Sequence, residues 1–157
     1  MRERSAVREV RRAREFEAFV AGAAGRLLHA ATLLTAEPVD DNPRARRLLL
    51  VALSGTYARW DRLRGEDPYD RTRQELASRF ARGAWRYHRI RGGVLDRLSP
   101  QERLILVLRL YEGVAEEQTA ALIGLPVERV HTICMRAIAV MRSKKPPSSR
   151  LRQVALP

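Results

Sequence analysis

The chain has 157 residues, enough for one ordinary domain or two small ones. Hydrophobic residues make up 45% of it, so we expect a sizeable core. Its single cysteine, Cys134, excludes an internal disulfide and favours a reducing compartment, so a cytoplasmic protein is expected. No apolar run approaches the roughly 20 residues of a membrane span, and the charged N-terminus lacks the apolar core of a signal peptide.

The charge balance is strongly basic. Lys and Arg number 30 against 18 Asp and Glu, which gives a formal net charge of +12. Such an excess favours an anionic partner, and nucleic acid is the partner we expect. The alternative is the coding bias of a GC-rich genome, because Lys144 and Lys145 are the only lysines and Ala and Leu are abundant.

Helical spacing of apolar residues extends over nearly the whole chain. A first helix is predicted from Phe16 to Leu34, preceded by a basic extension, residues 1–14. We expect this extension to be a solvated continuation of the helix, with contact to DNA or acidic lipid as the alternative. A second helix is predicted to begin at Pro43, with Asn42 as its N-cap, and to continue to Leu63.

The second half of the chain shows clearer boundaries. Asp67 and Pro68 predict the start of a third helix that continues to about Ile90. Ser99 and Glu102 have the spacing of a capping box, which begins a helix that ends at Gly113. Two further helices are predicted over 115–123 and 127–142, and the tail, 143–157, is expected to be disordered.

These elements predict an all-α fold of two small helical domains. The first, residues 15–91, contains three helices, and the second, residues 99–142, is a helix-turn-helix. The linker between them, residues 92–98, is so short that the two parts should pack against each other.

The last two predicted helices have the pattern of a DNA-binding helix-turn-helix. Gly124 allows the positive φ of a tight turn, and Pro126 sets the start of the second helix. One face of that helix is apolar and should point inward. The other presents residues suited to base edges and phosphates: Glu128, Arg129, His131, Thr132, Met135 and Arg136. An ordinary helical hairpin is the alternative.

At this point a family resemblance emerges. The stretch LSPQERLILVLRLYEGVAEEQTAALIGLPVERVHTICMRAIAVMR, residues 98–142, resembles region 4 of the extracytoplasmic-function group of sigma-70 factors. The upstream segments FEAFVAGAAGRLLHAATLLT, ALSGTYARWDRL and DPYDRTRQELASRFARGAWRYHR resemble region 2 of the same family. The resemblance implies a transcription initiation factor that binds promoter DNA and directs RNA polymerase.

The resemblance also implies roles for particular residues. The exposed face of the last helix would read the promoter −35 element. Near the −10 element the implied contacts are Trp85, Arg86, Tyr87 and Arg89, with the two aromatic rings stacking on flipped bases. The alternative is that Trp85 belongs to the core and the arginines form a solvated face.

The chain departs from the family where the family contacts polymerase. Members have a segment like DAEDLVQEAL, and here Arg46 and Arg47 replace acids while Leu50 and Val51 replace Gln and Glu. Charge reversal disfavours the usual partner. The alternative function is therefore a sigma-derived interaction or regulatory protein that no longer binds core polymerase in the usual way. Its partner would be an anti-sigma factor or another protein. The four apolar residues 48–51 form either a new contact or a deeper core.

Two more departures lie in the recognition helix, where His131 replaces a lysine and Ile133 an arginine. A histidine at a DNA contact would make binding sensitive to pH near neutrality. No metal-ligand spacing, phosphate-binding loop or nucleophile elbow is present. We therefore expect no enzyme activity, cofactor or metal.

Overall fold

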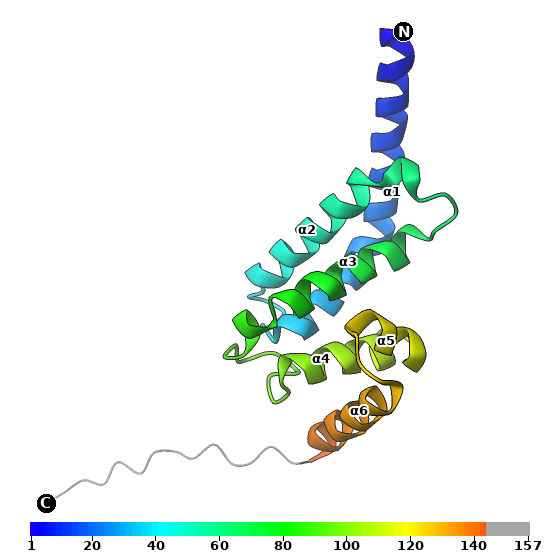
Figure 1. The fold of residues 1–157 in the computed structure, drawn as a ribbon. Helices are drawn as coiled ribbons and strands as arrows, with labels where there is room; N and C mark the ends of the chain where they lie inside the picture. The colour runs from blue at the N-terminus through cyan, green and yellow to red at the C-terminus, as the bar shows by residue number, and fades with distance from the viewer. Residues whose placement is uncertain (144–157) are drawn as a thin grey trace, which may run out of the picture.

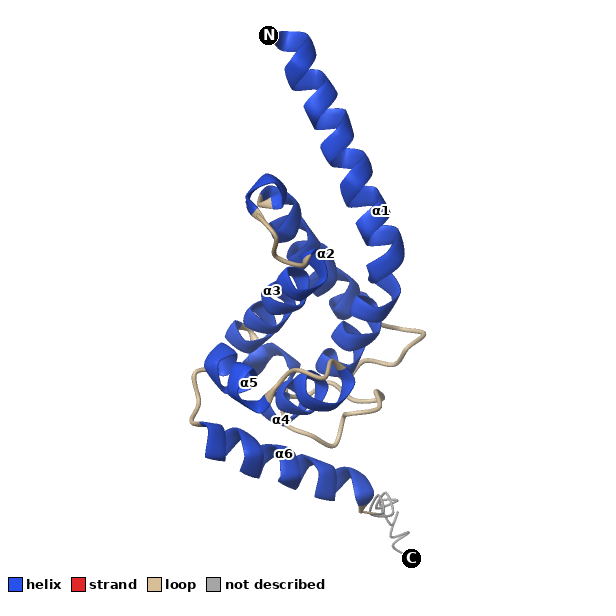
Figure 2. Cartoon of the chain, turned by 90° about the vertical axis from the view of Figure 1, so that its right-hand side faces the viewer, coloured by secondary structure: helices blue, strands red, loops and turns tan. Residues whose placement is uncertain are grey.

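The computed structural model describes residues 1–143, which form two layers of helices (Figure 1). One layer contains the long helices α1 (Arg2–Thr35), α2 (Pro43–Ala58) and α3 (Pro68–Arg82); the other contains α4 (Pro100–Leu106), α5 (Glu116–Ile123) and α6 (Val127–Arg142). Three short segments complete the order: the 3₁₀ turns η1 (Trp60–Arg62) and η2 (Ala84–Tyr87), and the π-helical turn η3 (Val107–Tyr111). The described residues contain helices and loops and no strand (Figure 2), so the all-α prediction is confirmed. The predicted tail lies outside the described residues, apart from Ser143.

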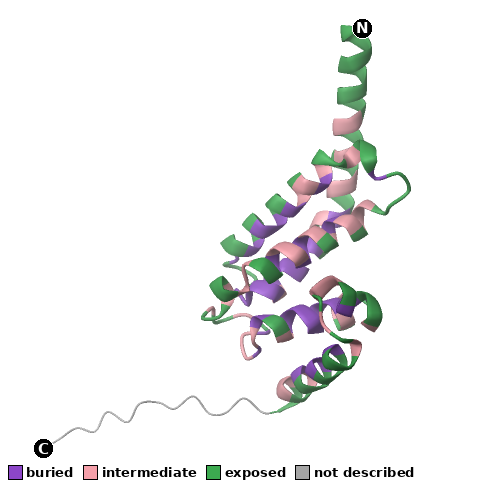
Figure 3. Cartoon of the chain, in the orientation of Figure 1, coloured by how far each residue is buried: buried purple, intermediate pink, exposed green. Residues whose placement is uncertain are grey.

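Helix α1 begins at Arg2, so the basic extension and the helix predicted from Phe16 form one continuous element. Its first part projects beyond the rest of the molecule and is exposed, as expected for a solvated extension (Figures 1 and 3). Arg12 marks the end of the projection. It donates to the carbonyl of Tyr57, and its guanidinium lies 4.5 Å from the centre of the Tyr57 ring.

The rest of α1 is a core helix. By length and composition, α1 is the one helix in the described part of the chain that could cross a membrane, a test that buried core helices also pass. Its apolar face is buried in the fold, where it packs mainly on α2, α3 and α4: Ala23, Leu27, Ala30, Ala31 and Leu34.

Helix α2 is capped differently from the prediction. Asn42 occupies the N-cap position, but its side chain donates to Thr32 Oγ1 and makes no cap bond. The buried carboxylate of Glu37 accepts from the backbone N–H groups of Arg44 and Ala45, at 3.1 and 2.7 Å. The predicted end at Leu63 was also wrong, since α2 ends at Ala58 and η1 follows.

Helix α3 lies antiparallel to α2 (Figure 1). Asp67 caps it by accepting from the N–H of Tyr69 at 2.9 Å, which confirms the predicted start. The predicted end at Ile90 was wrong, because α3 ends at Arg82 and Gly83 leads into η2. There the Tyr87 ring stacks on Phe80 with their centres 4.9 Å apart, which holds the turn against the core.

The two layers share one hydrophobic core, as the short linker predicts. A single buried cluster includes Leu34 and Phe80 from the first layer and Ile105 and Val130 from the second. Within the linker, the N–H of Gly93 donates to the carbonyl of Ala36 at 2.8 Å.

Arg103 of α4 lies at the centre of this joint and is 0% exposed. Its Nε donates to the carbonyls of Leu95 and Leu98, and its Nη1 to those of Leu34 and Tyr87. One arginine therefore holds the linker, α1 and η2 together.

A second polar contact joins the layers at the other end of α3. Tyr69 donates to both carboxylate oxygens of Glu112, at 2.8 and 3.0 Å, and the Glu112 side chain is only 1% exposed. Arg26 of α1 and Arg73 of α3 approach the same carboxylate at 3.8 Å. Glu112 follows η3 directly, so this cluster fixes the end of the π-helical turn against α1 and α3.

Candidate nucleic-acid interface

The α5–α6 pair has the local geometry of a helix-turn-helix. The capping box of Ser99 and Glu102 is present at the start of α4, as predicted. Gly124 ends α5 with φ +75°, a conformation that favours glycine, and α6 begins directly after Pro126. One face of α6 is buried, mainly against α4: Val130, Ile133, Cys134 and Ala137.

The opposite face of α6 is open to solvent. It carries every residue predicted to contact the −35 element: Glu128, Arg129, His131, Thr132, Met135 and Arg136, all exposed. Ile133 is buried, so the arginine that it replaces in the family has been exchanged for a core contact. The structure thus brings the predicted recognition residues onto one surface; their contact with DNA stays a prediction.

Two of these side chains are engaged within the protein, and Thr132 Oγ1 donates to the carbonyl of Glu128 at 2.9 Å. His131 Nδ1 lies 3.2 Å from Glu116 Oε1, and Arg109 Nη2 lies 3.7 Å from Glu116 Oε2. Glu116 is in the first turn of α5, where a negative charge is favourable. His131 is therefore turned toward α5, and Arg129 and Arg136 are the cations that this face offers outward.

A basic groove lies where α2, the end of α3 and η2 meet. Its volume is about 740 Å³, and five arginines line it: Arg44 and Arg47 from α2, Arg79 and Arg82 from α3, and Arg86 from η2. The remaining lining residues are Leu48, Val51, Gly83, Trp85 and Tyr87, so no acid is among them. Such a surface attracts anions.

The two aromatic residues of the groove differ in solvent exposure. Trp85 is 73% exposed, so the alternative that placed it in the core was wrong. The Arg86 guanidinium lies 5.1 Å from the centre of its ring. Tyr87 is half-buried against Phe80, and burial raises the pKa of its hydroxyl. Trp85 is thus the freer platform for a base.

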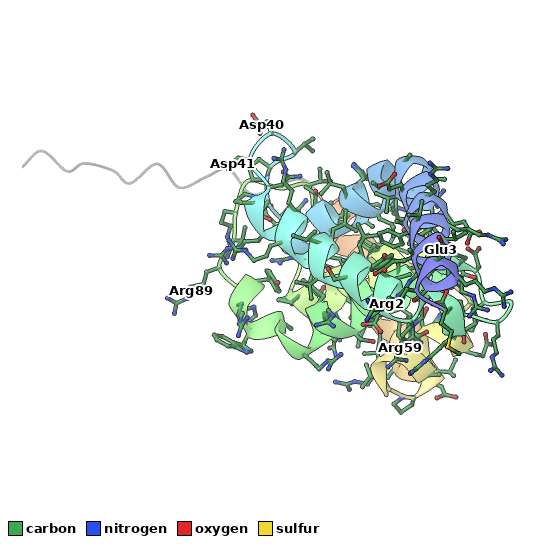
Figure 4. The ribbon with its side chains drawn as sticks, turned by 90° about the horizontal axis from the view of Figure 1, so that it is seen from above. Arg2, Glu3, Asp40, Asp41, Arg59 and Arg89 are labelled. Carbon is green, nitrogen blue, oxygen red and sulfur yellow. The ribbon has the colours of Figure 1, made fainter. Side chains whose placement is uncertain are left out.

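Arg89, the fourth residue of the predicted −10 set, does not line this groove. It is exposed and points away from the helices at one side of the molecule, whereas Arg2 and Arg59 lie toward the other side (Figure 4). The loop that carries Asp40 and Asp41 forms a separate edge in the same view.

The predicted polymerase-contacting residues all lie on the outside of α2. Leu50 is 65% exposed, and Arg46, Arg47 and Val51 are also exposed. The apolar run divides, because Leu48 and Leu49 are buried while the next two residues face outward. Arg47 and Val51 line the basic groove together with Trp85, so two sets of residues predicted to bind different partners meet there.

Among residues 1–143, no group of three or more His, Cys, Asp or Glu side chains is placed to hold a metal ion.

Comparison with known proteins adds independent information. Residues 94–143 match the family model described as Sigma-70, region 4. The chain is 27% identical to an RNA polymerase sigma-E factor of Streptomyces coelicolor, over 83% of this chain and 85% of the relative. It is 30% identical to an RNA polymerase sigma-E factor of Streptomyces antibioticus, over 83% of this chain and 84% of the relative. No solved structure matches.

The region 4 match covers α4, α5 and α6, which carry the capping box, the Gly124 turn and the exposed helix face. The sigma-E similarity extends over most of the chain. The chain therefore belongs to the sigma-70 family of RNA polymerase sigma factors and is similar to members of the sigma-E type.

Proposed function

We propose that this protein is a sigma factor that directs RNA polymerase to promoters, with the exposed face of α6 on the −35 element. The observation that carries the proposal is the position of α6 within the region 4 match, with its recognition face free of other helices. Sigma factors are not enzymes, and they act in the cytoplasm, where promoter DNA and polymerase are found.

The chemistry of the α6 face suits this role. Arg129 and Arg136 can bind phosphates or the acceptor edge of guanine, and Glu128 can accept from the amino group of cytosine. Met135 offers an apolar contact of the kind that thymine methyl groups make. Trp85 and Arg86, on η2 in the other layer, would lie near the opened −10 element.

The proposal includes a division of labour along the chain. Residues 15–91 would act as the region 2-like part and residues 99–142 as the region 4-like part, joined by residues 92–98. Support comes from the region 4 match over residues 94–143, which leaves the first three long helices to the other part. The Gly93 contact and the bonds from Arg103 to the linker hold the two parts together.

Promoter-directed transcription tests this function. Purified chain and core polymerase from the same bacterium would be combined on a library of genomic promoter fragments, and run-off transcripts would be sequenced. We expect a small set of start sites that share a −35 sequence. The double variant Arg129→Ala and Arg136→Ala should abolish them, and Arg4→Ala, on the distant projection of α1, should not. Absence of transcripts with a folded, unaltered chain would contradict the proposal.

A second function has specific support. Helix α2 contains no acidic residue, and Arg46 and Leu50 lie exposed at the positions where the resembled family segment has Glu and Gln. The chain could thus be a sigma-derived protein that regulates through an anti-sigma factor or another partner without usual polymerase binding. Size-exclusion co-elution with core polymerase separates the two functions. Co-elution favours the sigma factor; a folded chain that elutes alone, and gains binding on Arg46→Asp, favours the second function.

A further inference from the structure

The basic groove contains more positive charge than the predicted −10 contacts account for. Arg86 belongs to that predicted set, but Arg44 and Arg47 come from α2, where the family resemblance implies a contact with polymerase. Arg44 Nη1 donates to the carbonyl of Arg86 at 3.1 Å, which holds the start of α2 beside η2. With Arg79 and Arg82 of α3, arginines from three elements therefore line one shared groove.

We propose that Arg44 and Arg47 bind the sugar-phosphate backbone of a single DNA strand in this groove, together with Arg79, Arg82 and Arg86. Arg47, which replaces an acid of the family segment, and its neighbour Arg44 then extend a strand-binding surface onto α2 instead of forming a polymerase contact. The inference rests on the proposed function insofar as the strand is the opened promoter strand.

The charge in the groove is largely uncompensated. Within residues 1–143, no carboxylate lies within ion-pair distance of Arg44, Arg47, Arg82 or Arg86, and only Arg79 has such a partner, with its Nε 3.5 Å from Glu75 Oε2. Guanidinium groups are planar and bind phosphate oxygens through two N–H groups at once. A row of phosphates is thus the ligand that fits this lining.

The exposed tryptophan favours a nucleic-acid strand over an acidic protein helix. Trp85 presents a ring that no core residue covers, and Arg86 already stacks on it. Base stacking on an aromatic ring beside a basic track is the common arrangement for single-strand binding. An acidic helix would be expected to cover a broad apolar contact, but Leu50, the most exposed apolar residue of α2, does not line the groove, and Leu48 in its lining is buried.

Neighbouring arginines on α2 provide a matched control. Arg46 and Arg47 are adjacent and both exposed, but only Arg47 lines the groove. Exchange of either for Glu changes the net charge by the same amount. A difference between the two variants therefore reports on position and not on total charge.

Strand binding by the full chain is the test. Fluorescence anisotropy would measure the affinity for a labelled single-stranded oligonucleotide of about 12 nucleotides, within the usual site size. Arg47→Glu and Arg82→Glu should each weaken binding about tenfold and reduce the slope of log K against log salt by about 0.7 for each phosphate that is no longer bound. Arg46→Glu should change affinity less than about twofold, as expected for a surface change outside the site. Circular dichroism would confirm that each variant is folded.

Several binding results would overturn the inference. Equal effects of Arg46→Glu and Arg47→Glu would show attraction by net charge alone. Unchanged strand binding by Arg47→Glu, with altered co-elution with core polymerase, would assign the arginine to a protein partner. No measurable strand binding by the unaltered chain at low salt would also exclude the site.

The design separates this inference from the proposed function. Loss of strand binding in Arg47→Glu, with no promoter-directed transcripts from the unaltered chain, would contradict the sigma function and leave the groove assignment standing. Normal promoter-directed transcription by Arg47→Glu, with normal strand binding, would contradict the groove assignment alone.

Discussion

Arg103 Nη1 donates to the main-chain carbonyl of Tyr87 at 2.9 Å, so a buried side chain of α4 holds the turn that carries the groove tryptophan. The guanidinium has carbonyl partners instead of a carboxylate. One of them, Leu34, lies in the last turn of α1, where unpaired carbonyls carry partial negative charge. Burial lowers the pKa of Arg103. The dipoles of the four carbonyls stabilise its charge in place of water.

Replacement of Arg103 should therefore destabilise the whole fold. Arg103→Met removes the donors from four carbonyls and is expected to lower the free energy of unfolding by about 3 kcal/mol, the scale for buried polar groups left without partners. Urea denaturation followed by circular dichroism would measure the loss. Arg97→Met, which removes only contacts to Ser143 near the surface, is the control and should change stability little. An unchanged urea midpoint in Arg103→Met would refute the structural role.

Tyr69 should contribute stability that depends on pH. Its hydroxyl bonds to buried Glu112, and Tyr69→Phe should lower the free energy of unfolding by about 2 kcal/mol near neutral pH, as for a bond to a charged group. Burial and then this bond raise the pKa of Tyr69, so the folded state holds the phenolic proton more tightly than the unfolded state.

The sign follows from this difference in proton affinity. The contribution is complete below the ordinary tyrosine pKa of about 10 and decreases as the pH rises above it. The urea midpoint should thus decrease more between pH 8 and pH 10.5 for the unaltered chain than for Tyr69→Phe. Parallel losses in the two proteins would contradict the assignment, because ionisation of the other tyrosines is common to both.

Two glycines should respond to alanine in opposite directions. A Cβ on Gly93 would lie 2.3 Å from the carbonyl carbon and oxygen of Ala36, so Gly93→Ala must displace the linker and should be strongly destabilising. A Cβ on Gly25, inside α1, would meet no neighbouring atom within 4 Å, and Gly25→Ala should raise stability by about 0.5–1 kcal/mol through helix propensity. Thermal melts of the two variants would check both signs. A tolerated Gly93→Ala would mean that the linker does not pass so close to α1.

Duplex binding should depend on the α6 arginines in a way that salt reveals. Arg129→Ala and Arg136→Ala should each weaken binding of a −35 duplex, and for a phosphate contact the salt slope should decrease by about 0.9. A base contact would instead relax the sequence preference at one position. Anisotropy titrations at several salt concentrations distinguish these results. If the variants bind every duplex as tightly as the unaltered chain does, α6 is not part of the interface.

Local signals made much of the fold predictable. Asp67, Ser99 and Gly124 mark helix ends by chemistry contained within a few residues, and all three lie at the predicted positions. The exposed face of α6 was predictable for the same reason, because helical spacing alone separates Val130 and Ala137 from Arg129 and Arg136.

Features that depend on the path of loops or on the packing of separate elements escaped sequence reasoning. The cap of α2 comes from Glu37, whose approach to Arg44 and Ala45 depends on the path of a loop. Arg103 looks like one more surface arginine until four separate carbonyls converge on it.

The basic groove escaped prediction for a related reason. Arg47 and Trp85 were assigned to different contacts because 37 intervening residues separate them, and only the antiparallel packing of α2 on α3 places them along one groove. The one available signal was the number of arginines in both segments. A linear sequence does not show whether those arginines face the same surface.

The buried joint around Arg103 bears on the spacing between promoter elements. With the α6 face and the groove held by this joint, a protein that contacts DNA through both surfaces, as proposed, would compare two positions on DNA by rotation as well as by length. One inserted base pair turns the duplex by about 35° and lengthens it by about 3.4 Å. A flexible linker would absorb such a change, whereas this joint would make binding sensitive to the rotational phase between the two DNA sites.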